Sequence, residues 1–185
     1  AAVSGTALDA VAPVIFLGAL DWASGQQTVY KYGTGELIFK GNAAESGNYR
    51  LNLRTGTFRL AEGASLLINN ANVRDSLYLA EGTSSGRALV VETGATVVAG
   101  GLYMGSGPSN TVHVNGGSLT LTGSGVNGES GLIRVVEDTN PNGADRLIVD
   151  AGSLTFSDDD WLSLGVRGGG AEIIVNGGTA TFGRL

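Results

Sequence analysis

The residues from 138 to 145 have the types and spacing of a metal-binding loop. Asp138, Asn140 and Asn142 stand at alternate positions, and a glycine and then Asp145 follow them. This pattern resembles the start of a calcium loop, because Ca²⁺ prefers hard oxygen ligands. The Glu that usually closes such a loop is missing, since Val149 stands there. We expect an ordinary inter-strand turn. If a metal does bind, we expect Ca²⁺ at Asp138, Asn140, Asn142 and Asp145, with a Kd of about 10⁻⁴ M or weaker.

His113 is the only histidine of the chain. It alternates with Val112 and Val114, so on a strand its side chain points away from theirs, toward solvent. A serine–histidine–aspartate triad would need a serine and an aspartate from neighbouring segments. Ser118 and Asp150 are candidates, but their spacing does not favour them. We therefore expect a surface histidine without a catalytic role.

Asp158, Asp159 and Asp160 form the densest acidic cluster and directly precede Trp161. Polysaccharide-cleaving enzymes use clustered carboxylates, often together with Arg, Lys or Ca²⁺. Carboxylates that are adjacent on a turn usually face solvent, however, so we interpret this cluster as a solvated turn. The chain has no Cys, which excludes disulfides, thiolate metal sites and a cysteine nucleophile. The sequence predicts no catalytic residue, and no cofactor apart from the weak calcium site.

Composition narrows the class of protein before any fold is assigned. The chain has 185 residues, enough for one domain with a continuous core. Its net charge is −6 and it has no basic run, which argues against a nucleic-acid partner, because phosphates require clustered Lys and Arg. Thirty-one glycines with 42 % hydrophobic residues indicate short strands joined by tight turns rather than disorder.

An internal repeat organises most of the chain. Its pattern has two apolar positions, a glycine three residues later and a further apolar position four residues after the glycine. Five segments align with it without gaps: 51–60, 89–98, 112–121, 147–156 and 173–182. A sixth and weaker copy lies at 30–39. A glycine at one fixed offset between two strands indicates a positive φ or a close backbone approach. The aligned glycines are Gly35, Gly56, Gly94, Gly117, Gly152 and Gly178.

A third short strand is expected between some of these copies. It starts at Leu77, Leu102 and Leu162, with an earlier copy at Ile15. Successive glycines are separated by 21, 38, 23, 35 and 26 residues, and the long intervals carry extra material at 68–86 and 123–145. Three strands per unit and a period in the twenties are typical of a β-solenoid. A globular sandwich, the alternative, would not require the same glycine offset six times.

The repeat also predicts which side chains face the core. Its first, third and tenth columns should point inward: Leu51, Leu53, Leu60, Val91, Val98, Val114, Leu121, Val149, Phe156, Val175 and Phe182. The second column should point outward and consists of Asn52, Val90, His113, Ile148 and Ile174, of which the last two and Val90 are aliphatic. Ile148 and Ile174 would lie on adjacent strands, so they are expected to form an exposed apolar patch unless a loop covers them.

The most specific motif lies between residues 31 and 60. It combines a lysine, spaced glycines, a Gly-Asn pair and a Gly-Thr strand: Lys31, Gly33, Gly35, Leu37, Phe39, Gly41, Asn42, Gly47, Gly56, Thr57, Phe58 and Leu60. This motif closely resembles the passenger-associated β-strand repeat of bacterial autotransporters. Later units such as 112–121 look like related repeats, so the resemblance covers about 29–182. The chain departs from the family pattern in its irregular spacing and in having Tyr30 and Tyr32 at inner positions.

The resemblance implies an all-β, right-handed parallel β-solenoid with three-strand coils, about six of them. Residues 1–28 would form N-terminal capping strands, and 29–185 would form the repeats, cut from a longer solenoid with an unsealed C-terminal edge. It further implies a secreted protein displayed on the outer membrane of a Gram-negative bacterium by a C-terminal barrel. The expected function is a non-enzymatic stalk or adhesin that binds a host surface or other bacterial cells.

Two further classes of function remain open. The first is an enzyme, either a carbohydrate-active β-helix or the solenoid portion of a larger secreted protease. The second is a module that associates with itself, end to end or laterally. Activity toward polysaccharides would identify the first class, and concentration-dependent sedimentation would identify the second.

Overall fold

The computed structural model describes most of the repeats and parts of the N-terminal segment. The described residues are 2–3, 7–9, 14–16, 21–22, 27–44, 49–68, 77–79, 86–105, 107, 109–122, 132–135, 144–156, 161–164 and 170–183. They form strands and turns, and none of them forms a helix long and apolar enough to cross a membrane.

One side of the molecule is a seven-stranded sheet. Its neighbouring strands pair in parallel and follow one another in chain order, with one or two other strands between them along the sequence. The strands are β2 (Ala7–Asp9), β5 (Gln27–Tyr32), β8 (Tyr49–Leu53), β11 (Leu77–Leu79), β14 (Leu102–Met104), β16 (Leu132–Val135) and β18 (Trp161–Leu164). Strands β11 and β16 lie in the intervals 68–86 and 123–145, which therefore contribute to the stack.

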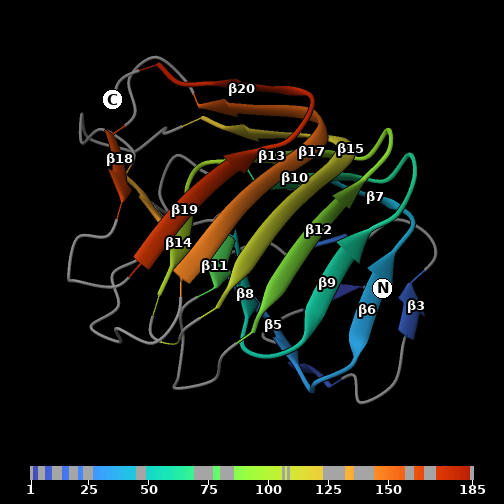
Figure 1. Cartoon of the computed structure of the whole chain (residues 1–185). Coiled ribbons are helices and arrows are strands. Elements are labelled where there is room, and N and C mark those ends of the chain that lie inside the picture. The colour runs from blue at the N-terminus through green and yellow to red at the C-terminus, as the bar shows by residue number, and fades with distance from the viewer. Residues whose placement is uncertain are drawn as a thin grey trace, which may run out of the picture.

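The other two sides belong to one curled, eleven-stranded parallel sheet, which we divide into two arms. The broad first arm crosses the front of Figure 1. It contains β3 (Val14–Phe16), β6 (Glu36–Phe39), β9 (Thr57–Leu60), β12 (Ala88–Glu92), the first halves of β15 (Thr111–Leu121) and β17 (Ala144–Phe156), and β19 (Gly170–Val175).

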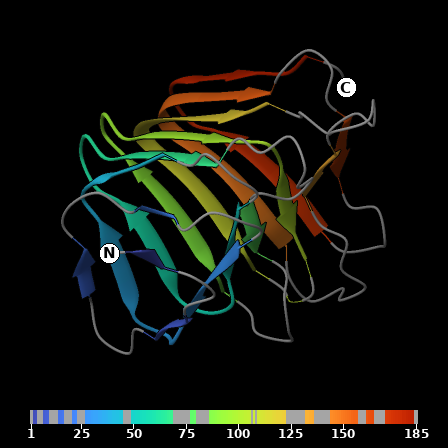
Figure 2. The ribbon, with the colours of Figure 1, turned by 180° about the vertical axis from the view of Figure 1, so that it is seen from behind.

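The second arm runs along the top of Figure 1 and is also visible from behind in Figure 2. It contains β7 (Asn42–Ala44), β10 (Ser65–Ile68), β13 (Thr96–Ala99), the second halves of β15 and β17, and β20 (Thr179–Thr181). Two further short strands pair with each other, β1 (Ala2–Val3) and β4 (Asp21–Trp22). The described chain is thus all-β, with mostly parallel strands in curled sheets, consistent with a β-solenoid-like fold.

The core lies between these sheets and is built mainly by alternation along the strands, although β12 and β14 each bury three consecutive residues. In β15, for example, Val112, Val114, Gly117, Leu119 and Leu121 are buried, while the other residues of the strand are not. Most of the predicted inward positions are confirmed as buried: Leu51, Leu53, Leu60, Val91, Val114, Leu121, Val149 and Phe156. The alternation follows from the pleat of a strand, which points successive side chains to opposite faces of the sheet.

Three predicted core positions differ. The prediction for Val98 is wrong, because Val97 and Ala99 are the buried residues of β13. The turn before β13 has one residue more than the corresponding bend in β15, which shifts the register by one. Val175 is 47 % exposed. Phe182 is partly buried and stacks on Phe156 at a centroid distance of 4.9 Å.

The glycines that the repeat aligns lie at two different corners of the fold. Phe58 pairs with Leu89, and Leu60 pairs with Val91, so β9 and β12 are equivalent strands of the first arm. Gly56 therefore precedes the first arm. The later aligned glycines lie instead between the two arms: Gly94, Gly117, Gly152 and Gly178. The predicted early copy of the third strand at Ile15 is also wrong, because β3 pairs with β6 in the first arm.

Candidate functional site

His113 and Asp150 form a pair on the outer surface of the first arm. The Nε2 atom of His113 lies 2.7 Å from Oδ2 of Asp150, and both side chains are partly exposed. Ser118, the third residue considered for a triad, lies five residues farther along β15, on the second arm. Its hydroxyl contacts Oγ1 of Thr96 at 3.4 Å. The structure therefore brings the histidine and the aspartate together and leaves the serine apart.

Asp150 accepts a second hydrogen bond from the strand on its other side. Asn176 Nδ2 donates to Asp150 Oδ1 over 2.7 Å. The hydrogen bonds from Asn176 and from His113, together with the His113 charge, lower the pKa of the Asp150 carboxyl below its ordinary value. Two such donors stabilise the ionised form of the carboxyl group, so this pair shows no sign of an activated acid.

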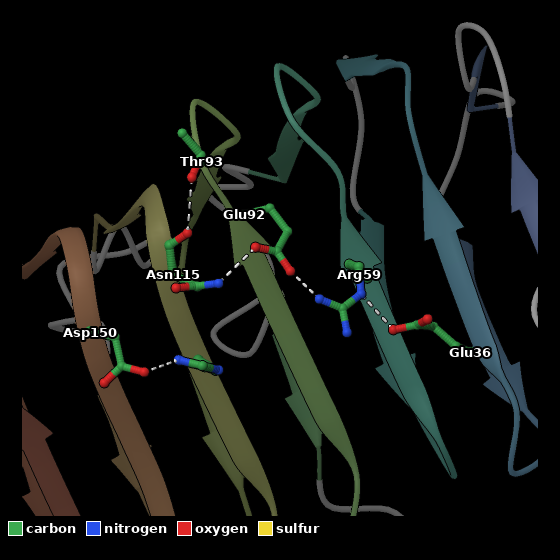
Figure 3. A network of polar contacts seen from close by, with 7 residues as sticks. Glu36, Arg59, Glu92, Thr93, Asn115 and Asp150 are labelled. Atoms are coloured by element: carbon green, nitrogen blue, oxygen red, sulfur yellow. Dashed lines mark hydrogen bonds and ion pairs between the residues drawn. The ribbon is translucent and has the colours of Figure 1, made fainter.

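A longer polar network crosses the same surface and appears in Figure 3. Arg59 donates through Nε to Glu36 over 2.6 Å and through Nη1 to Glu92, so it bridges three strands. Asn115 Nδ2 donates to the other oxygen of Glu92 over 2.9 Å. Burial lowers the pKa of Arg59, but its bonds and charges with Glu36 and Glu92 outweigh that effect and raise it. Farther along, Arg146 donates to Glu172 over 2.8 Å.

These contacts correct the predicted outward column. Arg59, not Asn52, pairs with Val90, and the column continues through His113 to Ile148 and then Ile174. Asn52 belongs to the seven-stranded sheet. Ile148 and Ile174 are neighbours as predicted, but both are only partly exposed. The first arm therefore alternates aliphatic side chains with side chains whose charges are paired on the same surface.

Of the four residues predicted to hold calcium, only Asp145 lies in the described part of the chain. It is 2 % exposed, and its Oδ1 accepts a hydrogen bond from the backbone N–H of Asn110 over 2.8 Å. Asp138, Asn140 and Asn142 lie outside the described residues, as do Asp158 to Asp160. Within the described residues, no group of three or more His, Cys, Asp or Glu could hold a metal ion. The calcium site stays a prediction.

Lys31, the lysine of the 31–60 motif, is fully buried at the corner between the seven-stranded sheet and the first arm. Its ammonium donates to the carbonyl oxygens of Tyr32, Gly33 and Thr55 over 2.8, 2.7 and 3.1 Å. An ammonium has three donors, and backbone carbonyls from two successive turns accept them. The lysine therefore joins neighbouring turns across a corner.

Gly56 is the partner that makes this arrangement fit. Its φ of +71° is a conformation that L side chains rarely adopt. A Cβ atom there would lie 2.5 Å from the carbonyl oxygens of both Gly33 and Gly35, and 2.8 Å from the Lys31 Nζ atom. The motif therefore places a glycine where the lysine and two turn carbonyls leave no room for a side chain.

Arg87 fills an equivalent corner later in the stack and is also fully buried. Its Nε donates to the Arg54 carbonyl over 2.9 Å, and Nη1 donates to Asn110 Oδ1 over 3.1 Å. Asn110 Nδ2 in turn donates to the Gly107 carbonyl over 2.6 Å. Together with Asp145, these residues form a buried polar corner that supports the start of the first arm.

The outer surface of the seven-stranded sheet carries a cluster that the sequence analysis missed. Arg50 lies over the ring of Tyr78, and Tyr78 stacks on Tyr103. The prediction of inner positions for Tyr30 and Tyr32 is wrong, because Val29 and Lys31, which alternate with them, are the buried residues. A signal was available, since the middle residue of each third strand is Tyr in Leu77–Leu79 and Leu102–Met104.

Comparison of the chain with models of known protein families, with curated proteins and with solved structures finds no match.

Proposed function

We propose that this chain is a non-enzymatic passenger segment of a bacterial autotransporter, built as a right-handed β-solenoid with about six three-strand coils. In this proposal it is secreted to the surface of the Gram-negative outer membrane. There it acts as a stalk or adhesin whose outer surfaces meet a host surface or other bacterial cells. Association with further copies, end to end or laterally, is compatible with this role.

The observation that carries the proposal is the corner made by Lys31 and Gly56. Both residues belong to the motif that resembles the passenger-associated repeat, and both have a structural task that this spacing satisfies. A lysine donating to two successive turns is useful only in a chain that stacks turns on one another. The structural roles of Lys31 and Gly56 therefore support the resemblance.

Protease accessibility on living cells tests this proposal. The native open reading frame, with an epitope tag in the 27–183 region, is expressed in a Gram-negative host, and intact cells are treated with an external protease. We expect the tagged segment to be degraded while a periplasmic marker protein stays intact. Protection of the tag in intact cells, with degradation only after lysis, would contradict surface display.

An enzyme that acts on carbohydrates is the second candidate, because His113 Nε2 and Asp150 Oδ2 lie 2.7 Å apart on the outer surface of the first arm. We expect no release of reducing ends or unsaturated sugars from polygalacturonate or alginate by the purified chain. Turnover that disappears in His113→Gln, with Ser118→Ala as the control, would replace the adhesin proposal by this one.

A further inference from the structure

The outer surface of the second arm, which runs along the top of Figure 1, is uncharged at every described outward position of its strands. The chain as a whole has 17 Asp or Glu and 11 Lys or Arg, and the first arm displays several of them. Such a surface favours an uncharged partner over a charged one. The outward side chains of the second arm alternate with those that face the core: Asn42, Ser65, Leu67, Thr96, Val98, Ser118, Thr120, Ser153, Thr155, Thr179 and Thr181.

The last three strands of this arm each present two hydroxyl groups. Strand pairing places Ser118 beside Ser153 and Thr120 beside Thr155, and it places the two residues of β17 beside those of β20. The six hydroxyls therefore stand in two columns that cross β15, β17 and β20. We call this set the hydroxyl face: Ser118, Thr120, Ser153, Thr155, Thr179 and Thr181.

The hydroxyl face is both accessible and held in place. Thr179 and Thr181 are exposed, and the other four residues are partly exposed. Between them, Leu119 and Leu154 are buried in the core, and Ala180 packs against it. A threonine on a strand also has few side-chain rotamers, because its Cβ is branched. The hydroxyls are therefore positioned before a partner arrives, which lowers the entropy lost on binding.

The spacing of the columns matches a hydrogen-bonded lattice of water. Neighbouring strands lie about 4.8 Å apart, so successive hydroxyls of a column have that separation. In a tetrahedral water network with O–H···O distances of about 2.75 Å, oxygens that share a neighbour lie roughly 4.5 Å apart. The mismatch over the whole hydroxyl face is about 0.6 Å, well below the length of a hydrogen bond. Along the strands, the two columns lie about 6.7 Å apart, against roughly 7.3 Å for the layer repeat of the same lattice.

We propose that the hydroxyl face binds ice, with its six hydroxyls in the places of lattice oxygens at the crystal surface. A hydroxyl can donate one hydrogen bond and accept two, so it can bond to lattice water in either sense. The threonine methyl groups are the apolar part of the contact, and covering them with the crystal releases the water around them. This inference goes beyond the proposed adhesin function and does not depend on it.

The form of the surface favours a crystal over other uncharged partners. Small ligands bind in concave sites, whereas these columns lie on the open face of a sheet. The outer surface of the second arm covers on the order of 300 Å², against about 800 Å² per partner in a stable protein interface. A crystal surface extends past the protein on every side, so it can contact all six hydroxyls at once and gain affinity by repeated contacts.

Growth of ice grains in a thin frozen film that contains the whole purified chain tests the proposal. We expect the grains to coarsen more slowly than in a film with serum albumin at the same concentration. Thr155→Tyr puts a large ring in the middle of the hydroxyl face and should lose most of this inhibition, whereas Thr155→Ser keeps the hydroxyl and should keep most of it. Ile148→Tyr is the matched control and should inhibit like wild type, because Ile148 faces outward from the same strand on the first arm.

Several results would overturn the inference. They are grain growth equal to that in albumin, full inhibition by a Thr155→Tyr variant whose melting temperature shows that it folds, or an equal loss in Ile148→Tyr. If Thr155→Tyr does not fold, Thr181→Tyr on β20 takes its place, with the same expected loss and the same contrary result. Retention on insoluble cellulose without any effect on ice, abolished by the same variant, would assign the face to a neutral polysaccharide and reject ice.

Discussion

The buried corners and the outer surface of the first arm use cationic side chains in opposite ways. Inside, Lys31 and Arg87 are fully buried and donate to backbone carbonyl oxygens. Outside, Arg59 and Arg146 donate to the carboxylates of glutamates on neighbouring strands. The first pair joins turns at corners, and the second pair connects strands that are already hydrogen-bonded through their backbones.

This difference predicts where the stability of the stack resides. A buried cation that loses its acceptors, or acceptors that lose their buried cation, cannot recover the lost bonds from water. An exposed ion pair exchanges its partner for water at little net cost and is screened by salt. Substitutions at the corners should therefore destabilise the fold far more than substitutions of the surface arginines.

Lys31→Met should give the largest effect. Methionine fills a similar volume but removes the donor to the carbonyls of Tyr32, Gly33 and Thr55, so we expect a loss of about 3–4 kcal/mol in the free energy of unfolding. Arg146→Met, its surface counterpart, should cost less than about 1 kcal/mol. Denaturant unfolding of both variants measures the difference. A loss in Lys31→Met as small as that in Arg146→Met would show that the corner lysine is dispensable.

Gly56→Ala should give the next effect. The methyl group adds a backbone clash to the strain of a positive φ, and we expect a loss of about 2–3 kcal/mol. Gly63→Ala is the matched control, because Gly63 has a φ of +75° but nothing within 4 Å of an added Cβ. It should lose only about 1 kcal/mol from backbone strain. Equal melting temperatures of the two variants would contradict the crowding at Gly56.

Asp150→Asn should give the smallest effect and should depend on pH. The folded protein lowers the pKa of Asp150 below its ordinary 3.8, so the ionised group stabilises the fold above that value. This stabilisation is lost as the pH falls through the folded pKa. Wild type should therefore melt slightly above the variant at pH 7, and the difference should shrink below about pH 4. Thr155→Ala, an uncharged outward change on the same strand, should show no such trend.

The alternation of apolar residues was sufficient to predict the strands and most of the core. Val114, Val149 and Phe156 were assigned correctly because a strand with one buried side has a period of two, whichever sheet it joins. The assignment of strands to sheets was less accurate. Gly56 and Gly117 have similar flanking residues, yet one precedes the first arm and the other separates the arms. Local spacing does not distinguish two bends of similar chemistry.

The interactions that cross between strands were beyond sequence reasoning. The distance from His113 to Asp150 depends on the register of β15 with β17, and that register depends on turns of unequal length. The roles of Lys31 and Arg87 were also hidden, because a cation in a strand is normally taken as exposed. Only the surrounding carbonyl groups show why these two side chains can be buried.

Strands β15 and β17 continue through the bend from the first arm to the second, whereas earlier strands stop there and resume after a turn. In these two strands the backbone remains a strand through the bend, although their pairing shifts register between Asn115 and Ser118. An opening that frees one arm must therefore pull on the other, which makes the two halves a single unit of local unfolding. Amide hydrogen exchange at Val114 and Leu121 should slow or quicken together, while exchange in β9 and β10 remains free to differ.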